Sequence, residues 1–179
     1  MEKQRTILNA QDMERVITRM AYEIIETHRG VSDLALAGIM TRGDFLAQRL
    51  QEKIFNIEGI KVPVGAMDIN LYRDDWTQIS HYPIVRASKI GFSVENQNII
   101  LVDDVLFTGR TIRAAMDAIM DFGRPARIEL AVLVDRGHRE LPLQADYCGT
   151  IVATLHSDRV NVCLKEYDGR DGVFLEQES

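Results

Sequence analysis

A short apolar run followed by a polar loop and an amphipathic helix occurs twice in this chain. The first unit joins the apolar run 34–39 to a helix predicted over 44–55. The second joins the run 98–102 to a helix predicted over 111–122, and another apolar run follows at 128–134. Short, continuously apolar runs are typical of strands covered on both faces of a parallel sheet. The pattern therefore predicts an α/β fold with a mostly parallel central sheet flanked by helices.

The rest of the chain fits around this unit as one domain spanning residues 1–179. Apolar residues at three- and four-residue steps predict a helix over 10–28, with an N-terminal cap formed by Asn9 and Asp12 and a stop at Gly30. The last part of the chain is expected to form short strands, at 150–153, 160–164 and 173–175.

Composition excludes several classes of protein. The 179 residues are 46% hydrophobic and 27% charged, as in globular proteins, and the net charge is −6. A nucleic-acid partner would therefore need a local basic patch. No stretch approaches the roughly 18 apolar residues of a membrane span, and the N-terminus leads into no secretory signal. The two cysteines, Cys148 and Cys163, lack metal-site spacing. We expect a cytoplasmic protein with reduced thiols.

The segment after the second apolar run carries the most chemistry. Asp103 and Asp104 follow directly on apolar residues, and a turn with Thr108, Gly109 and Thr111 then opens a helix. The backbone N–H groups at a helix start bind phosphate well. Paired carboxylates suit sugar hydroxyls or water around Mg²⁺. A plain strand-to-helix turn whose acids cap the helix remains the alternative.

Other polar segments also follow predicted strands. Ligands of parallel α/β sheets lie beyond the carboxyl ends of the strands, which singles out the loops 40–43, 103–111 and 135–139. Residues 73–93 have no clean periodicity, and a segment of this length between strands is commonly a functional lid or a β-hairpin.

The segment 99–111 resembles the signature by which type I phosphoribosyltransferases bind 5-phosphoribosyl 1-diphosphate (PRPP). That signature is four apolar residues, two acids and a turn bearing Thr-Gly. Three more segments, 38–43, 71–75 and 130–142, are similar to bacterial proteins that combine regulation of pyrimidine operons with uracil phosphoribosyltransferase activity. The resemblance runs from about Arg5 to Leu175.

The resemblance implies a type I phosphoribosyltransferase fold with a flexible flap and a small hood. It also implies that uracil N1 displaces diphosphate from PRPP, giving UMP. Asp103, Asp104 and Arg42 would be the catalytic residues, with the acids on the ribose hydroxyls and Thr41 and Arg42 on diphosphate. The 5-phosphate would be held by the loop residues Val105, Leu106, Phe107, Thr108, Gly109, Arg110 and Thr111.

The same resemblance implies the remaining parts of the site. Uracil would be recognised by the backbone near Val134 and Asp135 and by the side chain of Arg136, in the hood that follows the strand at 128–134. Tyr72 and Arg73 would begin the flap, at about 73–90, which closes over PRPP.

Mg²⁺ would bridge oxygens of PRPP, with contact to Asp103 or Asp104, and take much of its coordination from substrate and water. Purine-using relatives commonly carry an acid at the position of Phe107, so the aromatic residue favours a pyrimidine. Simple packing of Phe107 under the loop is the alternative.

A second role, in RNA binding, is also implied. In the resembled group a basic face of a dimer binds a stem-loop of pyrimidine leader RNA, more strongly with UMP or UTP. The matching residues here are Thr18, Arg19, His138 and Arg139, and the chain is expected to form at least a homodimer.

The chain departs from that group near this basic cluster. Thr150 and the segment 153–155 replace a basic residue and a Pro-Thr-Ser sequence. Three alternatives stay open: an ordinary solvated basic loop, an RNA-binding regulator that keeps the fold only as a nucleotide sensor, and a phosphoribosyltransferase for another base.

Overall fold

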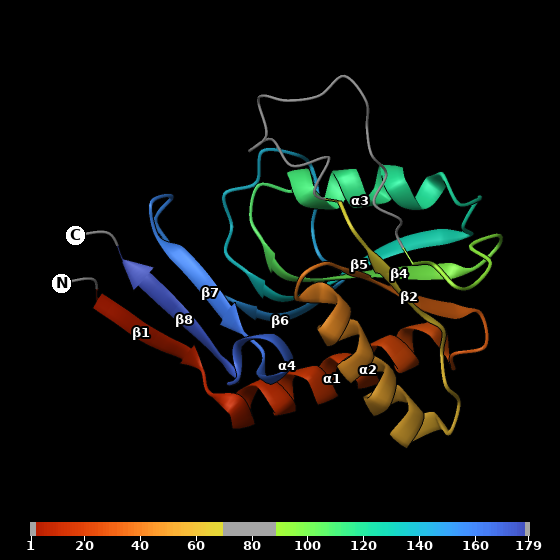
Figure 1. The fold of residues 1–179 in the computed structure, drawn as a ribbon, viewed down its shortest axis with the longest axis horizontal. Coiled ribbons are helices and arrows are strands. Elements are labelled where there is room, and N and C mark those ends of the chain that lie inside the picture. The colour runs from red at the N-terminus through yellow and green to blue at the C-terminus, as the bar shows by residue number, and fades with distance from the viewer. Residues whose placement is uncertain (1–2, 70–88, 178–179) are drawn as a thin grey trace.

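The computed structural model describes residues 3–69 and 89–177, which form a central five-stranded sheet, three long helices and a separate three-stranded sheet (Figure 1). In chain order the elements are β1 (Lys3–Leu8), α1 (Ala10–His28), β2 (Leu34–Ile39), α2 (Gly43–Glu58), β3 (Val64–Met67), β4 (Asn98–Leu106), α3 (Arg110–Met120), β5 (Arg127–Asp135), β6 (Tyr147–Ile151), β7 (Arg159–Cys163), α4 (Lys165–Asp168) and β8 (Gly172–Gln177).

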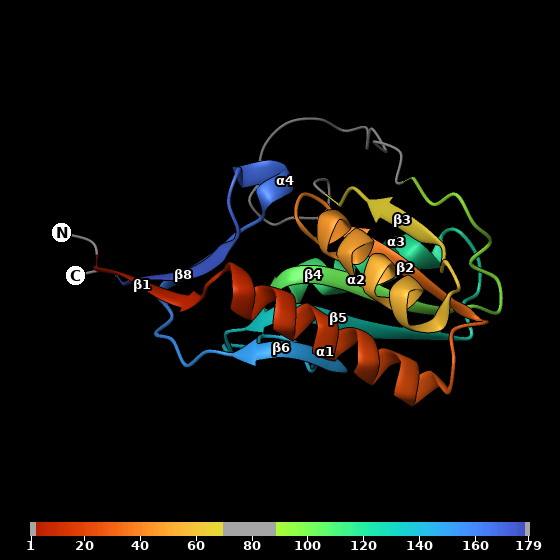
Figure 2. The same ribbon diagram turned by 90° about the horizontal axis from the view of Figure 1, so that it is seen from below.

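The central sheet is parallel throughout, with the strand order β3-β2-β4-β5-β6. Helices α1 and α2 cover one face and α3 covers the other (Figure 2). This arrangement confirms the predicted α/β class. It also brings the carboxyl ends of β2, β4 and β5 to one edge of the sheet.

Two apolar cores explain why the central strands read as continuous apolar runs. In β2, Leu34 and Leu36 pack in the core with α1 and α2, whereas Ala35 and Ala37 pack in the core with α3. All six residues of β2 are buried. Because successive side chains of a strand point to opposite faces, a strand covered on both faces needs apolar residues at every position.

The second sheet is antiparallel and joins the two ends of the chain. Its order is β1-β8-β7, with Lys3 paired to Gln177. Figure 1 shows both termini together at this sheet, and the short helix α4 lies between β7 and β8. The predicted tail strands are confirmed in kind, with shifted ends, but β6 belongs to the central sheet. The sequence reading did not anticipate β1 or β3.

Several element ends differ from the predicted ones. The span of α1 and the capping box of Asn9 and Asp12 are confirmed, but the left-handed C-cap residue is Arg29, one residue before the predicted Gly30. Strand β4 continues to Leu106 because its pairing with β5 extends to Asp135, whereas the sequence predicts a strand that ends at residue 102. The acid pair therefore lies in a strand and not in a loop. None of the described helices is long and apolar enough to cross a bilayer.

Candidate active site

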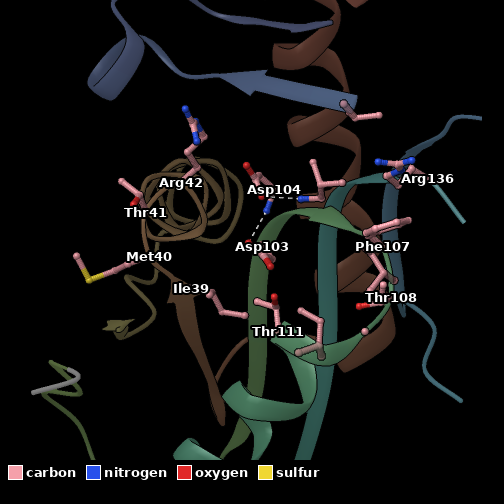
Figure 3. Close-up of a pocket in the computed structure, with 15 residues that line it drawn as sticks. Ile39, Met40, Thr41, Arg42, Asp103, Asp104, Phe107, Thr108, Thr111 and Arg136 are labelled. Carbon is pink, nitrogen blue, oxygen red and sulfur yellow. Dashed lines mark hydrogen bonds between the residues drawn. The ribbon is translucent and has the colours of Figure 1, made fainter. Parts of the chain in front are cut away.

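A cavity of about 340 Å³ lies beyond the carboxyl ends of β2 and β4, a volume that suits a small-molecule ligand (Figure 3). Of the residues predicted to bind PRPP, all except Arg110 line it. The side chain of Arg110 instead pairs with Glu140, 2.7 Å away. The rest of the wall is formed by Arg136, after β5, by Val160, on β7, and by Ile39, Met40 and Ile112. The cavity therefore lies between the central sheet and the three-stranded sheet.

The acid pair is held by the backbone of β4. The Asp103 carboxylate accepts the N–H of Asp104 at 2.9 Å, and the Asp104 carboxylate accepts the N–H of Val105 at 2.7 Å (Figure 3). Burial raises the pKa of Asp104 above its usual value, although the hydrogen bond from Val105 and the charge of Arg42 oppose that rise. These bonds fix two neighbouring carboxylates at the cavity wall.

The turn after β4 leads directly into the start of α3. Gly109 precedes the helix with φ at 91°, in the left-handed region that favours glycine, and as the N-cap residue it has no side chain to cap the helix. A Cβ at Gly109 would also lie 3.1 Å from Leu143. The Thr108 hydroxyl accepts the N–H of Arg110 at 3.3 Å. A helix start with glycine at its N-cap and two threonines of the lining beside it, Thr108 and Thr111, is a favourable place for a phosphate group.

The loop after β2 packs tightly on β4. A Cβ at Gly38 would lie 2.4 Å from Asp44 Cα, and a Cβ at Gly43 would lie 2.3 Å from the carbonyl oxygen of Val102. The peptide bond between Met40 and Thr41 is cis. Glycine is therefore required on both sides of the loop that carries Thr41 and Arg42.

The Arg42 side chain points away from the acid pair, toward α4 (Figure 3). Its Nε donates to Asp168 at 3.1 Å and its Nη2 donates to the same carboxylate at 2.8 Å. The guanidinium also lies 5.2 Å from the centre of the Tyr167 ring. The hydrogen bonds to Asp168 raise the pKa of Arg42, so this side chain is charged at any physiological pH.

The other end of the cavity is aromatic and cationic. The Arg136 guanidinium lies 4.1 Å from the centre of the Phe107 ring, and its Nη2 donates to the Leu155 carbonyl at 2.8 Å. The rings of His138 and His156 lie 5.9 and 5.2 Å from that of Phe107. Burial lowers the pKa of Arg136. Phe107 is thus packed on several sides while still lining the cavity.

The other two residues expected at uracil do not line the cavity. Val134 is fully buried in the core, and the Asp135 carboxylate accepts hydrogen bonds from the Gly137 N–H and from Arg139. Burial opposes ionisation of Asp135, but these hydrogen bonds outweigh it and lower its pKa. Asp135 therefore shapes the loop, and Arg136 is the member of this set that faces the cavity.

The four residues expected at RNA make internal contacts. Thr18 donates to the carbonyl of Glu14, and Arg19 donates to the Cys148 and Gly149 carbonyls of β6 at 3.1 and 2.6 Å. His138 Nε2 lies 2.8 Å from the Thr154 carbonyl. Arg139 contacts the carbonyls of Phe107, Gly137 and Leu143 and the carboxylate of Asp135. RNA contact by these residues stays a prediction.

The structure shows site residues that the sequence analysis did not predict, whereas some predicted site residues lie outside the described part of the chain. Asp168 and Tyr167, around Arg42, and Val160, in the cavity wall, belong to a segment that the chain brings back to the site from residue 159 onward. No spacing pattern marks them. Tyr72 and Arg73 lie outside the described residues, as does the predicted flap apart from its end, where Lys89 pairs with Ala66.

The described residues alone supply too few ligands for a metal ion at this site, so a bound substrate would have to supply the others. Among residues 3–69 and 89–177, no three His, Cys, Asp or Glu side chains gather closely enough to hold an ion. The adjacent carboxylates of Asp103 and Asp104 supply the hard oxygen donors that Mg²⁺ prefers. The acid pair thus fits an ion that takes its other ligands from substrate and water.

Comparison with known proteins gives a consistent result. Residues 3–162 match the model of the phosphoribosyl transferase domain. The chain is 52% identical over 172 residues to the bifunctional protein PyrR of Limosilactobacillus fermentum, covering 95% of this chain and 96% of that protein. It is 54% identical over 170 residues to the bifunctional protein PyrR of Deinococcus deserti, covering 95% and 93%.

Among solved structures, the fold resembles the hypoxanthine phosphoribosyltransferase of Trypanosoma cruzi. The TM-score is 0.75 at 16% identity, covering 98% of this chain and 97% of that one. A hypoxanthine phosphoribosyltransferase from Staphylococcus aureus gives a TM-score of 0.71 at 18% identity, covering 95% and 90%. At these identities the likeness concerns the fold alone.

Proposed function

Because the chain belongs to the bifunctional PyrR proteins and carries the phosphoribosyl transferase domain, we propose that it converts uracil and PRPP to UMP and diphosphate. One observation supports this activity above others. The acid pair, the start of α3 and the loop with Thr41 and Arg42 meet around a single cavity of about 340 Å³. PRPP presents a ribose, a phosphate and a diphosphate. The acid pair suits the ribose, the start of α3 suits the phosphate, and the loop with Thr41 and Arg42 suits the diphosphate.

The reaction forms one bond and breaks one. Uracil N1 attacks the ribose carbon C1 and loses its proton, while the bond from C1 to the diphosphate oxygen breaks and the diphosphate leaves with the electron pair. Positive charge develops on the ribose and negative charge on the leaving group. The protein must therefore supply position and charge rather than a covalent nucleophile.

We assign the roles by the chemistry of each wall. Asp103 and Asp104 accept hydrogen bonds from the ribose 2′ and 3′ hydroxyls, and the segment 105–109 with Thr111 holds the 5-phosphate. Thr41 and Arg42 bind diphosphate. Asp103 or Asp104 would hold Mg²⁺, which would supply positive charge to offset part of the charge of the diphosphate.

Uracil binds at the end of the cavity formed by Phe107 and Arg136. Arg136 and Phe107 line the cavity there. Phe107 occupies the position at which purine-using relatives commonly have an acidic residue. The space between Arg136, Phe107 and Val160 on β7 is the place for a flat pyrimidine ring. Base preference would then follow from the size and polarity of this end.

A panel of bases tests the enzyme against its alternatives. The protein is incubated with labelled PRPP, Mg²⁺ and uracil, cytosine, hypoxanthine or guanine in turn. We expect UMP with uracil and little product with the others. Product with a purine alone would support a phosphoribosyltransferase for another base. No product with any base, combined with measurable UMP binding, would support a regulator that uses the fold as a nucleotide sensor.

We also propose that the chain regulates pyrimidine genes by binding a leader RNA stem-loop, with UMP or UTP as the signal. Arg19 carries this proposal best because its side chain is 46% exposed, although it also donates to β6. Nearby, Ile151 and Leu155 expose 78% and 66% of their surface, so the face is less basic than the resemblance implies.

The RNA role has its own test. Arg19→Gln should weaken binding of a pyrimidine-leader stem-loop and flatten the dependence of log K on log salt by about one unit. Arg15→Gln, on the same helix and 70% exposed, is the control for a general loss of charge. Equal affinity of the wild-type protein for the stem-loop and for unrelated RNA would refute the regulatory role while leaving the enzyme untouched.

Two further proposals concern the whole protein. We expect at least a homodimer, which sedimentation distinguishes from the 20.3 kDa monomer. We also place the protein in the cytoplasm, which agrees with the free thiols of Cys148 and Cys163.

A further inference from the structure

The side chain of Arg42 is fixed by a carboxylate far away in the sequence. Asp168 accepts hydrogen bonds from Nε at 3.1 Å and from Nη2 at 2.8 Å, so it covers one edge of the guanidinium. Two-point contact of this kind sets the plane of the group as well as its position. The opposite edge, which carries Nη1, takes no part in this pair.

Asp168 is itself held rigidly. Its Oδ2 also accepts the backbone N–H of Leu164 at 2.8 Å, and its own N–H donates to the Leu164 carbonyl at 2.6 Å. Leu164 is fully buried in the core, which anchors α4. The Tyr167 ring closes a second side of the guanidinium. The position of Arg42 is thus set by the core through one short helix.

Arg42 also retains unused hydrogen-bonding capacity. A guanidinium has five N–H groups. Within the part of the chain that the structure describes, the hydrogen bonds of Arg42 go to Asp168 alone. Arg42 lines both the candidate active site and a neighbouring cavity of about 290 Å³, and Asp104 lines both as well. The guanidinium of a residue that lines the site therefore keeps N–H groups that Asp168 does not use.

We propose that Asp168 is a positioning residue that holds the Arg42 guanidinium ready for the diphosphate group of PRPP. This inference rests on the proposed function and deepens it by adding a residue that does not line the cavity. Ordering a long arginine side chain costs conformational entropy. When Asp168 has already ordered it, diphosphate binding does not bear that cost.

The test compares two carboxylates of the same segment. Asp168→Asn removes the charge and one acceptor beside Arg42. Asp171→Asn is the matched control, because Asp171 is 20% exposed against 19% for Asp168 and also pairs with an arginine, Arg49. Binding of diphosphate with Mg²⁺, and separately of UMP, is measured by calorimetry. We expect Asp168→Asn to weaken diphosphate binding about tenfold, equal to about 1.4 kcal/mol, with UMP binding unchanged.

A double-mutant cycle shows whether Asp168 acts through Arg42. In an Arg42→Ala background, Asp168→Asn should have no further effect on diphosphate binding. Asp168→Glu, which keeps the carboxylate, should restore part of the affinity and provides a variant with an intact ion pair if Asp168→Asn folds poorly.

The outcomes separate this inference from the proposed function. Unchanged diphosphate binding in Asp168→Asn, or tighter binding, would overturn the positioning role, since tighter binding means that the carboxylate competes with diphosphate. An equal loss with and without Arg42 would also overturn it. If Arg42→Ala alone leaves diphosphate binding intact, the proposed diphosphate site itself is wrong.

Discussion

Arginine side chains around the site are held by the protein's own acceptors. Arg139 donates to the Phe107 carbonyl at 2.8 Å and to the Leu143 carbonyl at 3.0 Å, and it pairs with Asp135. It thereby ties the loop after β5 to the turn after β4. A run of basic residues resembles a solvated RNA-binding patch in the sequence, whereas this arginine connects two loops of the candidate site.

This contact leads to a prediction about activity. Arg139→Ala should lower both the melting temperature and uracil phosphoribosyltransferase turnover, because two part-buried carbonyls lose hydrogen bonds worth about 0.5–1.5 kcal/mol each. Thermal unfolding and a steady-state assay measure the two effects. Arg113→Ala, at a side chain that is 66% exposed, is the control. A variant with normal turnover would show that the loop after β5 keeps its position without Arg139.

At the scale of elements, strand β4 and the loop after β2 build the site together. The acid pair reaches the cavity because β4 stays paired with β5 through Leu106. Thr41 and Arg42 reach it because Gly38 and Gly43 let the loop lie directly against its neighbours. The geometry of the site thus depends on close backbone contacts as much as on the reactive side chains.

Gly43→Ala tests that dependence. The new Cβ would lie 2.3 Å from the Val102 carbonyl oxygen, so the backbone must shift. We expect a destabilisation of about 1–3 kcal/mol together with weaker diphosphate binding. Gly91→Ala is the control, since a Cβ there has nothing within 4 Å. Denaturant unfolding and calorimetry give the two values, and unchanged diphosphate affinity would show that the loop does not depend on this contact.

The same scale shows which features a sequence can predict. The strands β2, β4 and β5, the three long helices and the acid pair follow from apolar patterns and spacing within a few tens of residues. Strand β1 does not, because Lys3–Leu8 is stabilised by pairing with β8 at the other end of the chain. Likewise, no local pattern connects Asp168 with Arg42. The outer contacts of the site depend on packing between distant segments, which spacing alone does not report.

At the scale of the whole molecule, ion pairs join the helix α4 to the helix α2 and the loop before it. Asp168 pairs with Arg42, and Glu166 pairs with Arg49 at 2.5 Å. Hydrogen bonds from these arginines lower the pKa of both carboxyl groups. Ion pairs therefore contribute to holding the three-stranded sheet, through α4, against the helix α2 that covers the central sheet.

Acid should weaken this connection. Both carboxyl groups have a lower pKa in the folded protein than in the unfolded chain. Their contribution is therefore complete above about pH 5 and is lost as the pH falls through the folded-state values. The double variant Asp168→Asn/Glu166→Gln should be less stable at neutral pH and lose less stability on acidification. Glu140→Gln, in an exposed pair with Arg110, is the control. Thermal melts across pH measure the difference, and parallel curves for wild type and double variant would contradict it.

The most direct test of the central claim measures UMP formation from uracil and PRPP by wild type and Asp104→Asn. The substitution keeps the size of the side chain but removes charge-assisted hydrogen bonds to the ribose, each worth about 1.5–3 kcal/mol, where about 1.4 kcal/mol is tenfold in rate. We predict a loss of at least about 100-fold in turnover with an unchanged melting temperature, while Asp117→Asn on the exposed side of α3 stays fully active. Turnover by Asp104→Asn close to that of wild type would contradict the assignment of the acid pair to the reacting ribose.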